Sequence, residues 1–102
     1  MNDIPWWRTS IGEPEVNRLL DSISKEHLSQ GPVTAEFETK LAEALNVPYA
    51  VVTTSGSVAL LMAAMALGIG PGDEVIVPNR TWIASAHAAV LLGAKAVPVD
   101  VL

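Results

Sequence analysis

The sequence has 102 residues, of which 50% are hydrophobic, and its six basic and eleven acidic residues give a formal charge of −5. This balance argues against nucleic acid as a partner, because proteins that bind a phosphate backbone use clustered cations. No cysteine is present, which excludes disulfides, and no apolar stretch reaches the roughly 20 residues of a membrane span, so we expect a cytoplasmic protein without a signal peptide or a membrane anchor.

Two amphipathic helices are predicted in the first part of the chain. Apolar residues recur at helical spacing over residues 14–28 and again over residues 34–45, with charged residues on the opposite faces. Thr34 is the predicted N-cap of the second helix. The Gly31-Pro32 pair separates the two helices. We assign residues 1–48 to an N-terminal helical segment.

The second part of the chain, residues 49–102, alternates strands and helices. The predicted order is strand 49–54, helix 57–67, strand 74–78, helix 82–92 and strand 95–101. Short connections between these elements indicate a parallel sheet with right-handed crossovers, so the predicted fold class is α/β with a βαβαβ unit. The first of these helices has almost no polar residue, which is typical of a helix buried on nearly all sides. We therefore expect the unit to be incomplete and to belong to a larger protein.

Two turns are candidates for phosphate binding. The glycines between 68 and 72 follow a helix and precede a strand, the reverse of the order in a dinucleotide-binding motif, and are interpreted as a helix end and a tight turn. Ser55, Gly56 and Ser57 follow a strand and precede a helix, where free backbone N–H groups and the helix dipole favour an anion. The alternative is an ordinary turn in which Ser55 or Ser57 caps the helix.

Trp82 follows the next predicted strand. Ligands of open α/β sheets collect at the carboxyl ends of strands, so Trp82 is expected near the Ser-Gly-Ser turn. A flat ring beside a phosphate site suits a planar phosphorylated cofactor, whereas the alternative is a core or interface aromatic. The neighbouring Arg80 is open to two interpretations, a contact with an anionic substrate or partner subunit, and a solvated surface cation.

Taken in order, several motifs resemble the N-terminal part of one family, the DegT/DnrJ/EryC1/StrS aminotransferases. The matching runs are Gly31–Glu38, Tyr49–Leu60, Ala66–Pro78, Thr81–Ala84 and Gly93–Asp100. The resemblance implies a pyridoxal-phosphate (PLP)-dependent nucleotide-sugar aminotransferase of the aspartate aminotransferase fold (fold type I). It also implies a homodimer with active sites at the subunit interface, which would explain the high apolar content. Residues 49–102 would then form the first part of the PLP-binding large domain.

The resemblance also assigns cofactor-binding residues. Ser55, Gly56 and Ser57 fall on the phosphate-binding turn, where the family has Ser-Gly-Thr, and Ser57 keeps the hydroxyl of that threonine. The backbone N–H groups of Gly56 and Ser57, with the Ser57 hydroxyl, would bind the cofactor phosphate. Trp82 falls on the family's aromatic residue, which would stack on the pyridine ring. The Gly31-Pro32 loop matches a family segment near the active site, and we assign it no role.

No catalytic residue is assigned within the sequence. In the family, the Schiff-base lysine and the acid that pairs with the pyridine nitrogen both lie downstream of the matching segment. The lysines of this chain are expected to be solvated cations: Lys25, Lys40 and Lys95. Asp100 does not match the family's acid in spacing and is interpreted as a strand-end residue or as a residue that contacts the site residues rather than the ligand. His27 and His87 have no partner at metal-ligand spacing, so no metal site is expected.

The expected function of the whole protein is transfer of an amino group, with glutamate as donor, to a nucleotide-linked keto-sugar. Two alternatives stay open. One is a relative in which the lysine is replaced and PLP drives sugar dehydration. The other is a non-catalytic fragment that presents the phosphate turn but lacks the lysine.

Overall fold

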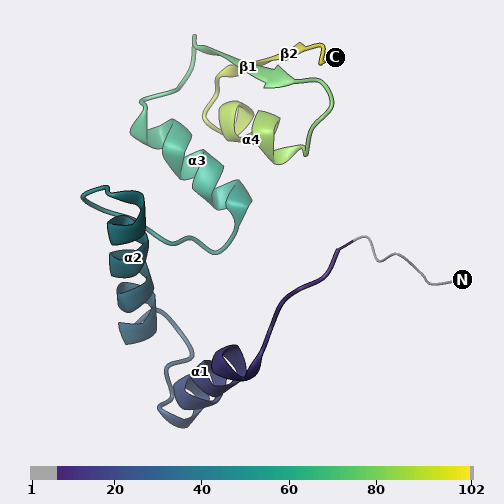
Figure 1. Cartoon of the computed structure of the whole chain (residues 1–102). Coiled ribbons are helices and arrows are strands. Elements are labelled where there is room, and N and C mark those ends of the chain that lie inside the picture. The colour runs from purple at the N-terminus through teal and green to yellow at the C-terminus, as the bar shows by residue number, and fades with distance from the viewer. Residues whose placement is uncertain (1–6, 102) are drawn as a thin grey trace, which may run out of the picture. The chain divides into compact units, whose positions relative to one another are not determined.

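A computed structural model describes residues 7–101, which form two compact units, one up to Ala50 and the other from Val51 (Figure 1). The helices of the first unit are α1 (Glu13–Ser24) and α2 (Pro32–Leu45). The elements of the second unit are α3 (Gly56–Ala66), β1 (Glu74–Pro78), α4 (Ala84–Leu91) and β2 (Lys95–Val99). No helix in the described part of the chain has the length and apolar character needed to cross a bilayer.

Helix α1 has an acidic first turn that stabilises its start. The N–H of Gly12 donates to the Glu15 carboxylate at 2.7 Å, and this bond holds the pKa of Glu15 below its usual value. The helix ends at Ser24, four residues before the predicted end at 28. Glu26 has a φ of 57°, and a residue in this left-handed conformation does not continue a right-handed helix.

Helix α2 begins at Pro32, with Gly31 as its N-cap, so the prediction that Thr34 is the N-cap was wrong. The physical reason is that proline is well suited to the first helical position: its φ is preset, and it has no N–H group to satisfy. Asn46, with a φ of 52°, terminates the helix.

An exposed ion-pair cluster joins α1 to α2. The Glu36 carboxylate of α2 accepts from Lys40 one turn later and from Arg18 of α1 at 3.3 Å. The hydrogen bond from Lys40, followed by that from Arg18, lowers the pKa of Glu36. Neither α1 nor α2 contains a buried residue.

The sheet of the second unit has two parallel strands rather than the three predicted. β1 pairs with β2 from Glu74 opposite Lys95 to Pro78 opposite Val99. β1 has the predicted bounds, and β2 ends two residues early. Residues 49–54 form no strand, so that prediction was wrong for the described structure. A strand requires a neighbour with which to share a hydrogen-bond ladder, and the described sheet consists of β1 and β2 alone.

Helix α4 connects the two strands, and α3 packs against α4 (Figure 1). The buried residues are small, with one valine: Ala64, Val77, Ala84, Ala88, Ala89 and Ala94. Small side chains at a helix contact allow the two helices to approach closely. Through this packing, α3 and α4 belong to one compact unit.

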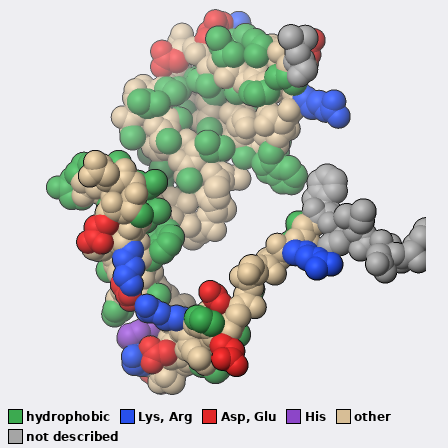
Figure 2. All heavy atoms as spheres, in the orientation of Figure 1, with side chains coloured by type: hydrophobic (Ala, Val, Ile, Leu, Met, Phe, Trp, Pro, Cys, Tyr) green, Lys and Arg blue, Asp and Glu red, His purple; other side chains and the backbone are tan. Residues whose placement is uncertain are grey.

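Large apolar side chains remain exposed on both units, as the green side chains of Figure 2 show. Helix α3 is the clearest case. The sequence predicted that parts of a larger protein bury this helix, and within the described chain Ala64 is its only buried residue, while Leu60, Met62 and Met65 are exposed. Exposed apolar surface of this extent is typical of contact with further protein.

Gly93 lies in the turn between α4 and β2, and a substitution there tests the geometry of this turn. Its φ is 81°, and an added Cβ would lie 3.1 Å from Cγ of Pro71. We expect Gly93→Ala to lower the free energy of unfolding by about 1–2 kcal/mol, because a side chain is strained in the left-handed region. Denaturant unfolding of the protein measures this loss.

Gly70→Ala is the matched control, because the nearest atom to its added Cβ, the Leu92 carbonyl oxygen, lies 3.9 Å away. It should change stability by less than about 0.5 kcal/mol. Equal losses for the two variants would contradict the described turn geometry.

Candidate functional site

Ser55 fixes the start of α3. It has an extended backbone, with φ −163° and ψ 160°, and its Oγ accepts a hydrogen bond from the N–H of Val58 at 3.3 Å. Its carbonyl oxygen accepts from the N–H of Ala59 and from the Thr53 hydroxyl, the latter at 2.8 Å. Of the two serines considered as the helix cap, Ser55 is therefore the N-cap.

This cap leaves the first two N–H groups of α3, those of Gly56 and Ser57, without any possible intrahelical acceptor. The positive end of the helix dipole lies at the same place. A Cβ added to Gly56 would meet no atom within 4 Å, so the space beside this backbone is open. An anion can therefore approach both N–H groups closely.

Trp82 lies in the loop between β1 and α4, and 77% of its surface is exposed. It is not a core residue of the second unit. Its carbonyl oxygen accepts from the N–H of Ser85 at 3.1 Å, in the turn that leads into α4. The indole ring is thus available to a ligand.

The starts of α3 and α4 line one open hollow of about 590 Å³. Its lining residues are Gly56, Ser57, Ala59, Leu60, Trp82, Ala84 and Ser85. Three of the four predicted site residues are thus brought together, and the fourth, Ser55, lies next to the hollow in sequence and caps the helix that borders it. The volume falls in the range of small-molecule sites, and a mostly apolar wall with a few polar groups is typical of them.

Ser85 is a lining residue that the sequence analysis did not identify. Its hydroxyl lies 3.3 Å from that of Thr81. The sequence did contain an indication of this residue: Ser85 comes three residues after Trp82, and residues three apart are neighbours on the surface of a helix.

The competing glycine turn is an ordinary one, as predicted. Gly68 and Gly72 have φ values of 73° and 97°, and the N–H of Gly70 donates to the Asp73 carboxylate at 2.8 Å. An acidic side chain therefore already occupies the N–H group of the central glycine, which disfavours a phosphate there.

The other charged residues that the sequence analysis considered do not line this hollow. Each lysine is exposed and forms an ion pair: Lys25 with Asp21, Lys40 with Glu36, and Lys95 with Glu74. Asp100 directly follows β2, as predicted for a strand-end residue, and accepts from the Asn79 side chain at 3.1 Å. Arg80 and His87 are exposed.

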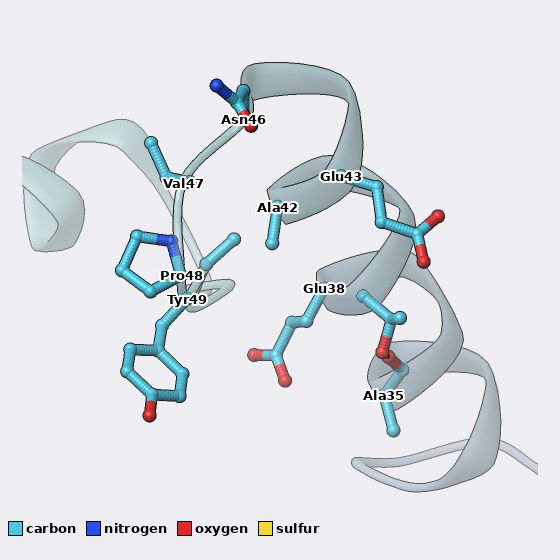
Figure 3. A pocket seen from close by; sticks show the side chains of 10 residues that line it. Ala35, Glu38, Ala42, Glu43, Asn46, Val47, Pro48 and Tyr49 are labelled. Atoms are coloured by element: carbon cyan, nitrogen blue, oxygen red, sulfur yellow. Dashed lines mark hydrogen bonds between the residues drawn. The ribbon is translucent and has the colours of Figure 1, made fainter.

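A second hollow, of about 570 Å³, lies in the first unit between α2 and the segment after it (Figure 3). Glu38 and Tyr49 point into the open space from its two sides. None of the predicted site residues lines it. Within residues 7–101, no group of three His, Cys, Asp or Glu side chains could hold a metal ion.

The comparison with known families agrees with the motifs along the chain. The sequence model of the DegT/DnrJ/EryC1/StrS aminotransferase family matches residues 9–102. The chain belongs to this family.

Solved structures of this family have the same fold over the matched segment. A Streptococcus pneumoniae protein assigned as a sugar aminotransferase has 35% identity and a TM-score of 0.87 over 97% of this chain. An aminotransferase of Psychrobacter cryohalolentis has 37% identity and a TM-score of 0.82 over 97% of the chain. A family aminotransferase of Brucella abortus has 39% identity and a TM-score of 0.75 over 85% of the chain.

The chain spans about a quarter of the length of these structures, between 23% and 25% of each. The Streptococcus pneumoniae protein was solved in an apo form and in forms with pyridoxamine phosphate and PLP. The second unit, with its two parallel strands and apolar helices, is thus a segment of a larger α/β fold, fold type I of the PLP enzymes.

Substitutions of Ser55 and Ser57 should differ in their effect on the free energy of unfolding. We expect Ser55→Ala to lower the free energy of unfolding by about 1 kcal/mol, because Val58 loses its capping acceptor. Ser57→Ala should change it by less than about 0.5 kcal/mol, because Ser57 is exposed and is not the N-cap. Thermal or denaturant unfolding of both variants checks this, and a larger loss for Ser57→Ala would show that the cap is assigned to the wrong serine.

Proposed function

We propose that this chain is the cofactor-anchoring part of a PLP-dependent aminotransferase. One observation supports this proposal. Gly56 and Ser57, whose N–H groups have no intrahelical acceptor, line the same hollow as the exposed Trp82. A phosphate group and a planar ring, joined by a short linker, are the two parts of PLP that such a hollow would accommodate.

The start of α3 suits a phosphate dianion. The N–H groups of Gly56 and Ser57 and the Ser57 hydroxyl would donate to its oxygens, and the helix dipole adds favourable charge. Gly56 allows close approach because it has no Cβ. Ser55 acts through its cap: its Oγ is engaged by Val58, which keeps the first turn of the helix in place.

Trp82 would hold the pyridine ring. Trp82 lines the hollow and is exposed rather than used in the core, so stacking on a ligand ring buries an aromatic surface that is otherwise in water. Stacking orients the ring and excludes water from one of its faces, while it moves no proton itself.

Bound PLP supplies an electron sink for amino-group transfer, and the protein supplies orientation and acid–base groups. The residues described here provide the orientation. None of the three lysines is proposed as the covalent partner, since each is an exposed ion pair, and Lys95 lies at the amino end of β2. The lysine and the acid of the reaction are proposed to lie in the part of the family fold that this chain does not span.

We further propose that the whole protein aminates a nucleotide-linked keto-sugar with glutamate as donor and works in the cytoplasm as a homodimer. The similarity to a sugar aminotransferase supports the substrate class. The exposed apolar side chains of α3 support burial against further protein, from the same chain or a second copy. Residues 1–48 would form the N-terminal helical segment and residues 49–102 the first part of the PLP-binding domain.

The test is cofactor affinity of the intact protein. We expect Trp82→Ala to weaken PLP binding by roughly tenfold, because the stacking surface is lost. Trp82→Phe is the matched control and should remain within about threefold of the wild type, because it keeps an aromatic face. Equilibrium dialysis against PLP gives both values, and unchanged affinity of Trp82→Ala would refute the role of the ring.

A further inference from the structure

A polar cluster joins the carboxyl ends of the two strands next to the proposed cofactor site. Asn79, the first residue after β1, donates its N–H to the Val99 carbonyl oxygen at 2.8 Å and its side-chain amide to Asp100 Oδ1 at 3.1 Å. The same Oδ1 accepts from the N–H of Val101 at 3.0 Å. The pairing of β1 with β2 therefore continues for one residue beyond the ladder, which ends at Pro78 opposite Val99.

This cluster fixes the beginning of the loop that carries Trp82, three residues after Asn79. The other end of that loop is also held, by the bond from Ser85 N–H to the Trp82 carbonyl and by the contact between the Thr81 and Ser85 hydroxyls. Trp82 thus lies between two anchored points of the backbone.

Such anchoring is needed because packing does not hold the ring. With 77% of its surface exposed, Trp82 has few neighbours that restrict its side chain. The backbone of residues 79–83 then sets the position from which the indole extends, that is, the direction of the Cα–Cβ bond of Trp82. A backbone that is held in place before the ligand arrives lowers the entropic cost of binding.

We propose that Asn79 and Asp100 form a positioning pair that orients Trp82 for cofactor binding without touching the cofactor. The proposal rests on the PLP site described above. Of the two interpretations of Asp100 from the sequence, the hydrogen bond from the Asn79 amide to its carboxylate favours the supporting residue that does not contact the ligand.

The hydrogen bond of this pair can be removed by replacing either Asn79 or Asp100. Asn79→Ala and Asp100→Ala should each weaken PLP binding of the intact protein by roughly 3- to 10-fold, the range of one net hydrogen bond. Asp100→Asn should retain most of the affinity, because its amide oxygen still accepts from Asn79 and from Val101. Loss of affinity in Asp100→Asn equal to that in Asp100→Ala would overturn the proposed hydrogen-bonding role.

A matched control lies at the opposite end of the same two strands. Lys95 donates to Glu74 Oε1 at 2.7 Å, so Glu74→Ala also removes an exposed polar contact between β1 and β2. It should leave PLP affinity unchanged. If it weakens binding as much as Asn79→Ala does, the effect is general destabilisation of the sheet, and the positioning role is overturned.

A double-mutant cycle separates this inference from the cofactor site itself. In a Trp82→Ala background, Asn79→Ala should cause no further loss of PLP affinity, because the pair acts through the ring. Additive losses would overturn the positioning role while leaving the stacking role intact. Unchanged affinity in Trp82→Ala alone would instead refute the proposed site, and the positioning role with it.

Discussion

The cap on α3 is the interaction on which the described site depends. Because the Ser55 hydroxyl accepts from Val58, the chain turns into a helix at Gly56, and two backbone N–H groups remain without intrahelical acceptors. Polar backbone groups of this kind are costly to bury and favourable toward an anion. Beyond Ser57 the helix is apolar, so these N–H groups and the Ser57 hydroxyl are the polar groups of its first turn.

The parallel pairing of β1 and β2 adds the second half of the site. Since the chain leaves β1 at its carboxyl end and enters α4 within a few residues, the connecting loop must lie on that edge of the sheet. Packing of α3 on α4 through alanines then brings Trp82 to the same hollow as Gly56 and Ser57. The β1–α4–β2 unit thus places the flat ring, and the packing of α3 on α4 places the anion-binding turn beside it.

The sequence predicted the parts of this structure that depend on local chemistry. The turn glycines, the bounds of β1 and the place of Trp82 beyond the carboxyl end of β1 all follow from spacing and from the rule of strand ends. Trp82 and the Ser-Gly-Ser turn do line one hollow as predicted, but the turn follows no strand, and the packing of α3 on α4 brings the two together. The prediction of a strand at 49–54 was wrong because a strand forms only beside a neighbouring strand. The prediction of Thr34 as the N-cap of α2 was wrong because Pro32 is well suited to the first position of this helix. The bond from Asn79 to Asp100 was missed because it depends on strand register, which the pattern of residues does not define.

We propose that the start of α3, and not the glycine turn at 68–72, anchors the phosphate of PLP. A crystal structure of the intact protein with PLP tests it directly. We expect phosphate oxygens within about 2.7–3.2 Å of the backbone nitrogens of Gly56 and Ser57, with the pyridine ring against Trp82. A phosphate bound elsewhere, with these two nitrogens facing water, would contradict it.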